Sequence, residues 1–527
     1  MTQTDLNPRL EVVPARLRFR ITPGASDLVF VLVLVSVLVG GRFRLLNDPG
    51  TFWHLRLGHQ IAATGDVPRF DDLTFTHAGS PWVDQSWAFD LGLATVVGWG
   101  GLSLACLVTS LALAGLYAAV TGDLERDGRS PLVALVVGML AAGVGATHFL
   151  VRPHVLTLVL VWVMLRICQR FHERGGWGIA WAPVVTALWA NVHGGFLAGP
   201  IILVSALMGE AVTGPSIRER KGRLLALTVA IIVSLLAALA TPYGLALYRH
   251  VVELLVSSRV TDLIQEYQPI PFGRGDVRVV EIMILGLIAV PMIAGARMTR
   301  YELIHTLVWL HLALGSIRHA PIFALAAAPG LSRMLQGLVS PSNENARLND
   351  FTVRRESDTN SLWPGAAAIA LVAASLSGVS FGSLDRQNWP LEALPVLRSI
   401  PAHRPLFHEQ DWGGLVEWEL AGERQAFIDD RFELFGRGEI LAYVNALEGG
   451  PEWDEIQRRW HIEVVWIRPE RAGTPSWKAT LAGGSPSMTP SQSSSFDTAP
   501  RRKRLPLERA ESARLRADIP GHGVNDP

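Results

Sequence analysis

Two aspartates mark the ends of a polar stretch at residues 47–87. Asp48 stands in Asn47-Asp48-Pro49, and Asp84 stands in Asp84-Gln85-Ser86-Trp87. A carboxylate within hydrogen-bond reach can remove the proton from an attacking hydroxyl group. Two carboxylates can instead hold a divalent cation such as Mg²⁺ or Mn²⁺. Aspartate before proline is also typical of a helix start, so catalysis and helix capping both stay open for Asp48.

Polar residues recur at four other junctions, and three of these carry arginine or histidine. A guanidinium group matches the geometry of a phosphate, whereas an arginine that reaches lipid headgroups is the alternative. Polar residues at the ends of membrane spans are candidates for function. The alternatives are that His54 anchors its helix at the membrane–water interface, that Asn191 joins two helices by a hydrogen bond and that Glu266 is a surface acid. The predicted substrate-binding or phosphate-binding residues are His54, Arg152, His154, Asn191, His193, Glu266, Arg318 and His319. The pair Asp71-Asp72 is interpreted as a solvated turn.

The composition places these residues in a membrane protein. The chain has 527 residues, 49% of them hydrophobic and 18% charged, with a mean hydropathy of +0.27. That is too apolar for an ordinary soluble protein of this length. The net charge is zero, which argues against nucleic acid as a partner. Both cysteines, Cys106 and Cys168, lie in apolar runs, so a disulfide framework is not expected.

Eleven apolar segments are long enough, or nearly so, to cross a bilayer as helices. They lie at about 26–41, 101–121, 131–150, 153–169, 178–192, 196–213, 224–240, 279–296, 301–317, 320–338 and 364–381. The apolar run 87–99 is shorter and is predicted to lie at the membrane surface. With that choice the arginine-rich loops all fall on one side, which the positive-inside rule makes cytoplasmic. The N-terminus is then cytoplasmic, and the polar motifs all face outward.

The chain changes character after the last apolar segment. We expect residues 1–25 to be a cytoplasmic N-terminus and 26–381 a transmembrane domain with an outer catalytic loop at 42–100. Residues 382–470 alternate short strand and helix patterns, which predicts a small extracytoplasmic α/β domain. Strands are expected at 405–407, 425–428 and 462–467. The tail 471–527 and the polar stretch 339–362 are expected to be disordered or flexible.

Several of these motifs together resemble the GT-C superfamily of membrane glycosyltransferases, in particular its PMT/ArnT-like and RgtA/B/C/D-like group. The resemblance begins with Asp48-Pro-Gly-Thr-Phe-Trp-His54, Gly65-Asp-Val-Pro68 and Pro81-Trp-Val-Asp-Gln-Ser-Trp87. Later pieces resemble a bacterial branch of GT-C-like proteins: Arg152-Pro-His, Trp189-Ala-Asn-Val-His-Gly-Gly, Thr241-Pro-Tyr-Gly, Arg318-His-Ala-Pro and Asp411-Trp-Gly-Gly with Ile428-Asp-Asp-Arg431. Asp48 falls on the position of the family's catalytic acid. It is followed by Pro49, where the family usually has glutamate.

The resemblance implies an inverting transferase in the inner membrane of a bacterial cell. It would take a sugar from a polyprenyl-phosphate donor and pass it to a glycan, lipid or protein acceptor of the envelope. Asp48 or Asp84 would accept the proton, and Arg152 or Arg318 would stabilise the leaving phosphate. A flippase or transporter of lipid-linked glycans and a non-catalytic scaffold for envelope assembly are the alternatives.

Overall fold

The structure is a computed structural model. It describes residues 18–20, 23–41, 43–213, 217–257, 260–339, 359–472 and 477. The predicted disorder of the tail and of the stretch 339–362 therefore falls largely outside the described residues. So does most of the predicted cytoplasmic N-terminus.

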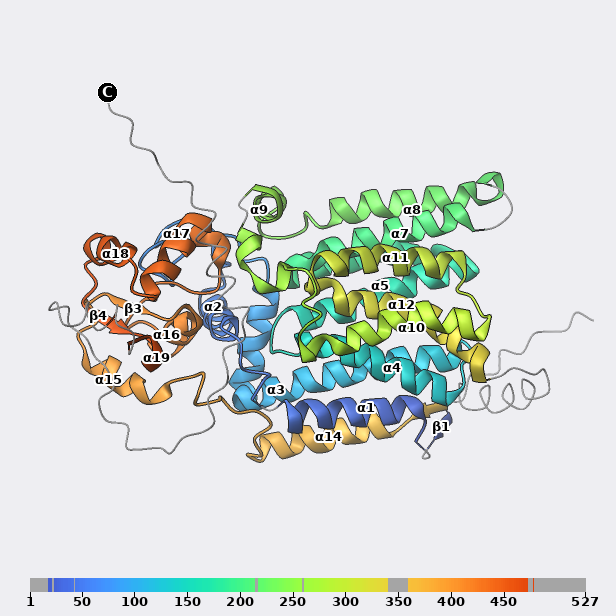
Figure 1. Cartoon of the computed structure of the whole chain (residues 1–527), viewed down its shortest axis with the longest axis horizontal. Helices are drawn as coiled ribbons and strands as arrows, with labels where there is room; N and C mark the ends of the chain where they lie inside the picture. The colour runs from blue at the N-terminus through green and yellow to red at the C-terminus, as the bar shows by residue number, and fades with distance from the viewer. Residues whose placement is uncertain are drawn as a thin grey trace, which may run out of the picture. The chain divides into compact units, whose positions relative to one another are not determined.

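Apolar helices that run side by side form most of the described chain (Figure 1). All eleven predicted segments are helical. The helices are α1 (Ala25–Val35), α3 (Trp87–Arg126), α4 (Pro131–Gly145), α5 (His154–Arg174), α6 (Trp181–Val192), α7 (Ala198–Val212), α8 (Ile217–Ala237), α10 (Arg278–Ala294), α11 (Arg300–Gly315), α12 (Ala320–Val339) and α14 (Trp363–Leu376). Among the described residues, six helical stretches are long and apolar enough to cross a membrane. The chain is thus a polytopic helical membrane protein, and eleven spans remain a prediction.

Large apolar side chains on the outside of the helices fit a lipid surrounding. On α10, for example, Ile282, Leu285 and Ile288 are more than half exposed. Such a row would be costly in water but is the normal surface of a helix in a bilayer.

The first part of α3 is separated from the rest by a break. Gly100 and Gly101 leave the helical conformation, and Gly101 adopts a φ of 67°, a region that favours glycine. The helical stretch before the break matches the segment 87–99 that was predicted to lie at the membrane surface. A short amphipathic helix, α2 (Gly50–Thr64), packs against α3.

The contacts between the loops that join the helices form two groups. One group joins residues of the predicted outer loops: Arg69 donates to the carbonyl of Pro242 (2.9 Å), and Arg437 pairs with Asp262 (3.3 Å). The other group holds ion pairs of the predicted cytoplasmic loops, such as Arg223 with Glu210 at 3.2 Å. On this second side β1 (Arg18–Arg20) pairs in parallel with β2 (Thr359–Ser361). Which group faces the cytoplasm stays a prediction.

The C-terminal segment (residues 385–472) packs on the predicted outer loops (Figure 1). Its two strands, β3 (Leu406–His408) and β4 (Val464–Trp466), pair in parallel. Its helices are α15 (Leu394–Ser399), α16 (Gly413–Glu419), α17 (Phe432–Leu447), α18 (Glu452–Trp460) and α19 (Pro469–Ala472). Near the other outer loops lies α9 (Leu245–Val252).

The predicted strand at 425–428 is wrong, because its backbone bonds to the loop at 73–75 and not to the sheet. Ala426 forms a single parallel bridge with Thr74. Its N–H donates to the carbonyl of Leu73, and its carbonyl accepts from Phe75, both at 3.0 Å. The C-terminal segment and the loop are thereby joined through their backbones.

Candidate functional site

Asp48 lies between the first apolar helix and α2, and its carboxylate serves two purposes. The side chain is buried, with 4% exposure. Its Oδ2 atom accepts hydrogen bonds from the N–H of Gly50 (3.1 Å) and from Thr51 Oγ1 (3.4 Å), which stabilises the first turn of α2. The same oxygen lies 2.8 Å from Nε of Arg152. Asp48 therefore both supports the helix start and forms a buried ion pair.

Arg152 lies among three carboxylates from three separate parts of the chain. Besides Asp48, it pairs through Nη2 with Asp430 of the C-terminal segment, and its Nη1 lies 4.0 Å from Glu266 Oε1. Gly50 makes room for this arrangement, because a Cβ atom there would lie 2.1 Å from Nη2 of Arg152. The predicted residues Asp48, Arg152 and Glu266 are thus brought together.

Burial and the neighbouring charges shift the pKa of Asp48. Burial raises the pKa of Asp48 to about 7, and the neighbouring Asp430 and Glu266 add to the effect while Arg152 opposes it. Burial also works against ionised Glu266, but Arg318 and Arg152 outweigh it and lower its pKa to about 2. Asp48 therefore gains or loses a proton near neutral pH, and burial raises the pKa of its neighbour Asp430 as well.

Arg318 has uncharged hydrogen-bond partners, in contrast to Arg152. Its Nη1 donates to the hydroxyl of Tyr267 (2.6 Å), and its Nη2 donates to Nε2 of His193 (3.3 Å). Burial and the nearby arginine hold the pKa of His193 well below its usual range, so the ring is neutral. His193 is fixed from its other side by Thr157, at 2.7 Å from Nδ1. Glu266 acts electrostatically on both arginines, but Arg152 is also paired with Asp48 and Asp430, so the positive charge of Arg318 is less neutralised.

A second buried group surrounds Asp84. The Asp84 carboxylate accepts from the N–H (3.0 Å) and the hydroxyl (3.1 Å) of Ser86 through Oδ1. Burial raises the pKa of Asp84 to about 6. His54 Nδ1 lies 2.7 Å from Asp90 and 3.3 Å from Ser86. His54 and Asp84 are thus linked through Ser86.

Three predicted residues form hydrogen bonds outside the groups around Asp48 and Asp84. Asn191 accepts from Trp87 Nε1 (2.9 Å) and donates to the carbonyls of Ala187 and Ala240 (2.8 Å), so it joins helices. His154 bonds to the carbonyl of His148. His319 donates to the carbonyl of Leu312 at 3.3 Å.

Two acidic residues of this region were not predicted from the sequence to belong to the site. Asp430 belongs to the quoted segment Ile428-Asp-Asp-Arg431, which was the available signal. Asp71 was predicted to be a solvated turn, but the structure places it in the interior at 2% exposure. Its carboxylate pairs with buried Arg431 at 2.8 Å, and Arg431 also pairs with Asp429 at 2.5 Å. The distant arginine explains the burial, and a local pattern could not reveal it.

The side chains do not fit the divalent cation considered for Asp48 and Asp84. In the described part of the chain, no group of three or more His, Cys, Asp or Glu side chains is arranged to hold a metal ion. The guanidinium of Arg152 already lies between Asp48, Asp430 and Glu266. Asp84 turns to Ser86 instead.

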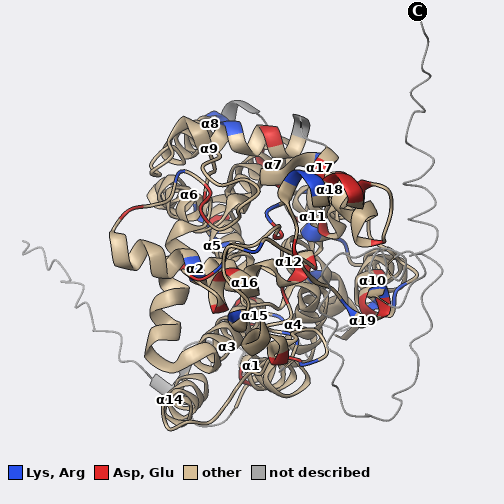
Figure 2. Ribbon diagram, turned by 90° about the vertical axis from the view of Figure 1, so that its left-hand side faces the viewer, with Lys and Arg blue, Asp and Glu red and all other residues tan. Residues whose placement is uncertain are grey.

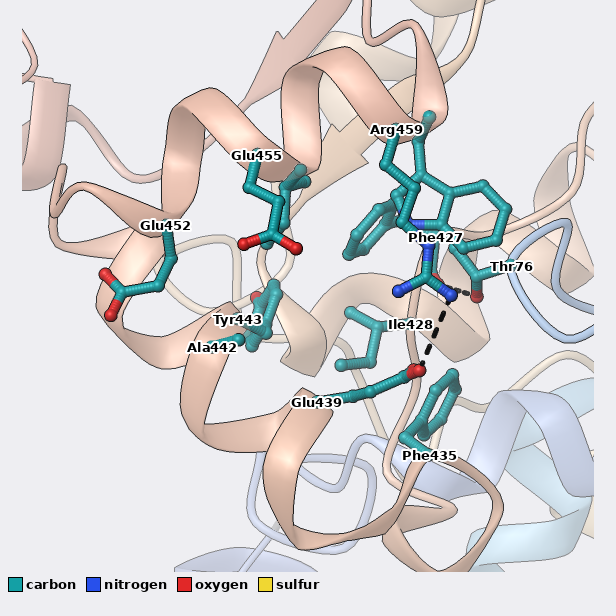
Figure 3. Close-up of a pocket in the computed structure, with 12 residues that line it drawn as sticks. Thr76, Phe427, Ile428, Phe435, Glu439, Ala442, Tyr443, Glu452, Glu455 and Arg459 are labelled. Atoms are coloured by element: carbon teal, nitrogen blue, oxygen red, sulfur yellow. Dashed lines mark hydrogen bonds and ion pairs between the residues drawn. The ribbon is translucent and has the colours of Figure 1, made fainter. Parts of the chain in front are cut away.

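Acidic and basic residues of several elements occur on the side of the molecule that carries the C-terminal segment (Figure 2). A small pocket lies between α17, α18 and residues 427–428 of this segment, and Thr76 also lines it (Figure 3). Its volume of about 90 Å³ is below that of usual ligand pockets. It is lined by aromatic residues and glutamates, and none of the predicted site residues lines it.

Comparisons with known proteins add one structural likeness. No protein-family model matches the chain, and no curated protein matches it. The chain is similar to the crystal structure of the Archaeoglobus fulgidus oligosaccharyltransferase in the apo form, with a TM-score of 0.49 and 10% sequence identity. The match covers 83% of this chain and 68% of that one. At this level no residue role is carried over.

Proposed function

We propose that the protein is a membrane glycosyltransferase of the GT-C kind. It transfers a sugar from a polyprenyl-phosphate donor to an envelope acceptor on the outer face of the cytoplasmic membrane. The observation that carries the proposal is the buried group around Asp48, in which a carboxyl group with a pKa of about 7 lies where the outer loops meet the apolar helices. A lipid-linked donor reaches such a position laterally from the bilayer.

Asp48 and Arg318 have separate roles in the proposed reaction. The acceptor oxygen forms a bond to the anomeric carbon while the bond from that carbon to the phosphate oxygen breaks. The acceptor proton passes to Asp48, whose pKa suits proton transfer near neutral pH. The electron pair leaves with the phosphate, whose charge is stabilised by Arg318. Arg152 is less suited to that task because carboxylates already surround it.

Substitution of Asp48 tests the proposal. Asp48→Asn in purified protein should lower sugar transfer from a polyprenyl-phosphate donor by at least ~100-fold, the usual range for a lost general base. Asp66→Asn is the matched control, since that carboxylate is in the same loop but exposed, and it should retain full activity.

Arg318→Gln should lower kcat as well, because the charge on the leaving phosphate develops in the transition state. Full activity of Asp48→Asn would refute the assignment. A wild-type protein that moves the lipid-linked glycan across vesicles without transferring sugar would support the transporter instead.

A further inference from the structure

Asp430 is held in place by buried neighbours on both sides. Before it, the N–H of Phe427 donates to Nε2 of His408 at 2.9 Å. After it, Arg431 is fixed by Asp429 and Asp71. The segment around Asp430 thus has a defined position against the first outer loop.

Helix α16 brings the C-terminal segment close to the start of α2. A Cβ atom on Gly414 would lie 2.6 Å from the carbonyl oxygen of Pro49 and 3.1 Å from the N atom of Trp53. Only a residue without a side chain allows this approach. The C-terminal segment therefore packs directly on the residues that follow Asp48.

The Asp430 carboxylate has two partners. Its Oδ1 accepts from Nε1 of Trp53 at 2.5 Å, and its Oδ2 pairs with Nη2 of Arg152. Arg152 uses a different nitrogen, Nε, for Asp48. The guanidinium is consequently held between Asp430 and Asp48, and neither carboxylate alone fixes its orientation.

We propose that Asp430 is a positioning residue of the same site, which orients Arg152 against Asp48 and contributes negative charge to the surroundings of Asp48. The inference rests on the proposed function and deepens it, because the C-terminal segment then belongs to the site and is more than a partner-binding part. The charged groups that face Asp48 are Arg152, Asp430 and Glu266, and the N–H of Gly50 also points to it.

Asp430→Asn removes one of the two negative neighbours of Asp48. The pKa of Asp48 should then fall below its value of about 7, since nearby like charge is what disfavours ionisation. Isotope-edited infrared titration of the full-length protein, with the Asp48→Asn spectrum subtracted, measures that pKa directly. We expect a fall of about one unit, an unchanged value in the exposed control Asp454→Asn and a return toward the wild-type value in Asp430→Glu.

The pH dependence of sugar transfer is the second measurement. In Asp430→Asn the acidic limb of sugar transfer should move to lower pH, while the maximal rate falls because Arg152 is less well oriented. An Asp48 pKa that stays the same or rises would overturn the inference. Asp430→Ser removes the same charge and gives the same test if the asparagine variant does not fold. A wild-type protein without transferase activity would refute the proposed function but leave the infrared test intact.

Discussion

Gly50→Ala places one methyl group into the centre of the Asp48 group. The new Cβ would lie 2.1 Å from Nη2 of Arg152 and 2.9 Å from Oδ2 of Asp430. Ordinary contact begins at about 3.5 Å, so the guanidinium must retreat by about 1.4 Å. That movement breaks the ion pair with Asp430 and weakens the one with Asp48.

The expected loss of unfolding free energy is about 2–4 kcal/mol, between the cost of overpacking and that of a broken buried ion pair. Unfolding in a denaturing detergent titration measures it. Gly92→Ala is the matched control: this helical glycine has open space around its Cβ position, and alanine should gain up to ~1 kcal/mol there. Transfer activity of Gly50→Ala should fall by about 100-fold, as expected when a reacting group is misplaced by about 1 Å.

Arg152→Lys provides a sharper check, because lysine lacks the Nη2 atom that the methyl group meets. In that background Gly50→Ala should cost less than ~1 kcal/mol, a clear departure from additivity. An equal cost in both backgrounds would show that the methyl group acts on something other than the guanidinium. A loss below ~0.5 kcal/mol in the wild type, the usual size for an uninvolved surface site, would refute the geometric reasoning altogether.

Two further predictions follow from the buried charges. The folded-state pKa of Asp48 is about 7 and its ordinary value is 3.8, so transfer should increase as pH rises through 7. The folded protein should lose stability as pH rises from about 4 to 7, because over that range the unfolded chain has lost the proton that folded Asp48 still holds. Asp48→Asn should remove that pH-dependent component, and an unchanged stability profile would contradict the shift. Arg431→Gln leaves buried Asp71 and Asp429 without their cation and should lower the free energy of unfolding by about 3–5 kcal/mol. The control is Arg386→Gln, at an ion pair whose two side chains are both more than 80% exposed. It should change the free energy of unfolding by less than ~0.5 kcal/mol. Similar losses of unfolding free energy in these two variants would mean that Arg431 does not stabilise the contact between the loop and the C-terminal segment.

The candidate site was only partly accessible from the sequence. Asp48, Arg152, Glu266, His193 and Arg318 stood out because ionisable residues at span ends are costly without a role. Their pairing could not be predicted from the sequence, since Asp48 and Arg152 are about a hundred positions apart. Asp71 shows the limit most clearly: beside Asp72 it looks like a solvated turn, and only Arg431 makes its burial tolerable.

The sequence by itself predicted the helical membrane architecture, and it set the segment 87–99 apart from the span that begins at about 101. Bilayer thickness and backbone hydrogen bonding leave an apolar stretch few alternatives to a helix. Only the tertiary structure decided that residues 425–428 join the first outer loop and that Asp430 reaches Arg152. Ion pairs and backbone bridges between distant segments depend on where the helices place the loops, and no local pattern encodes that placement.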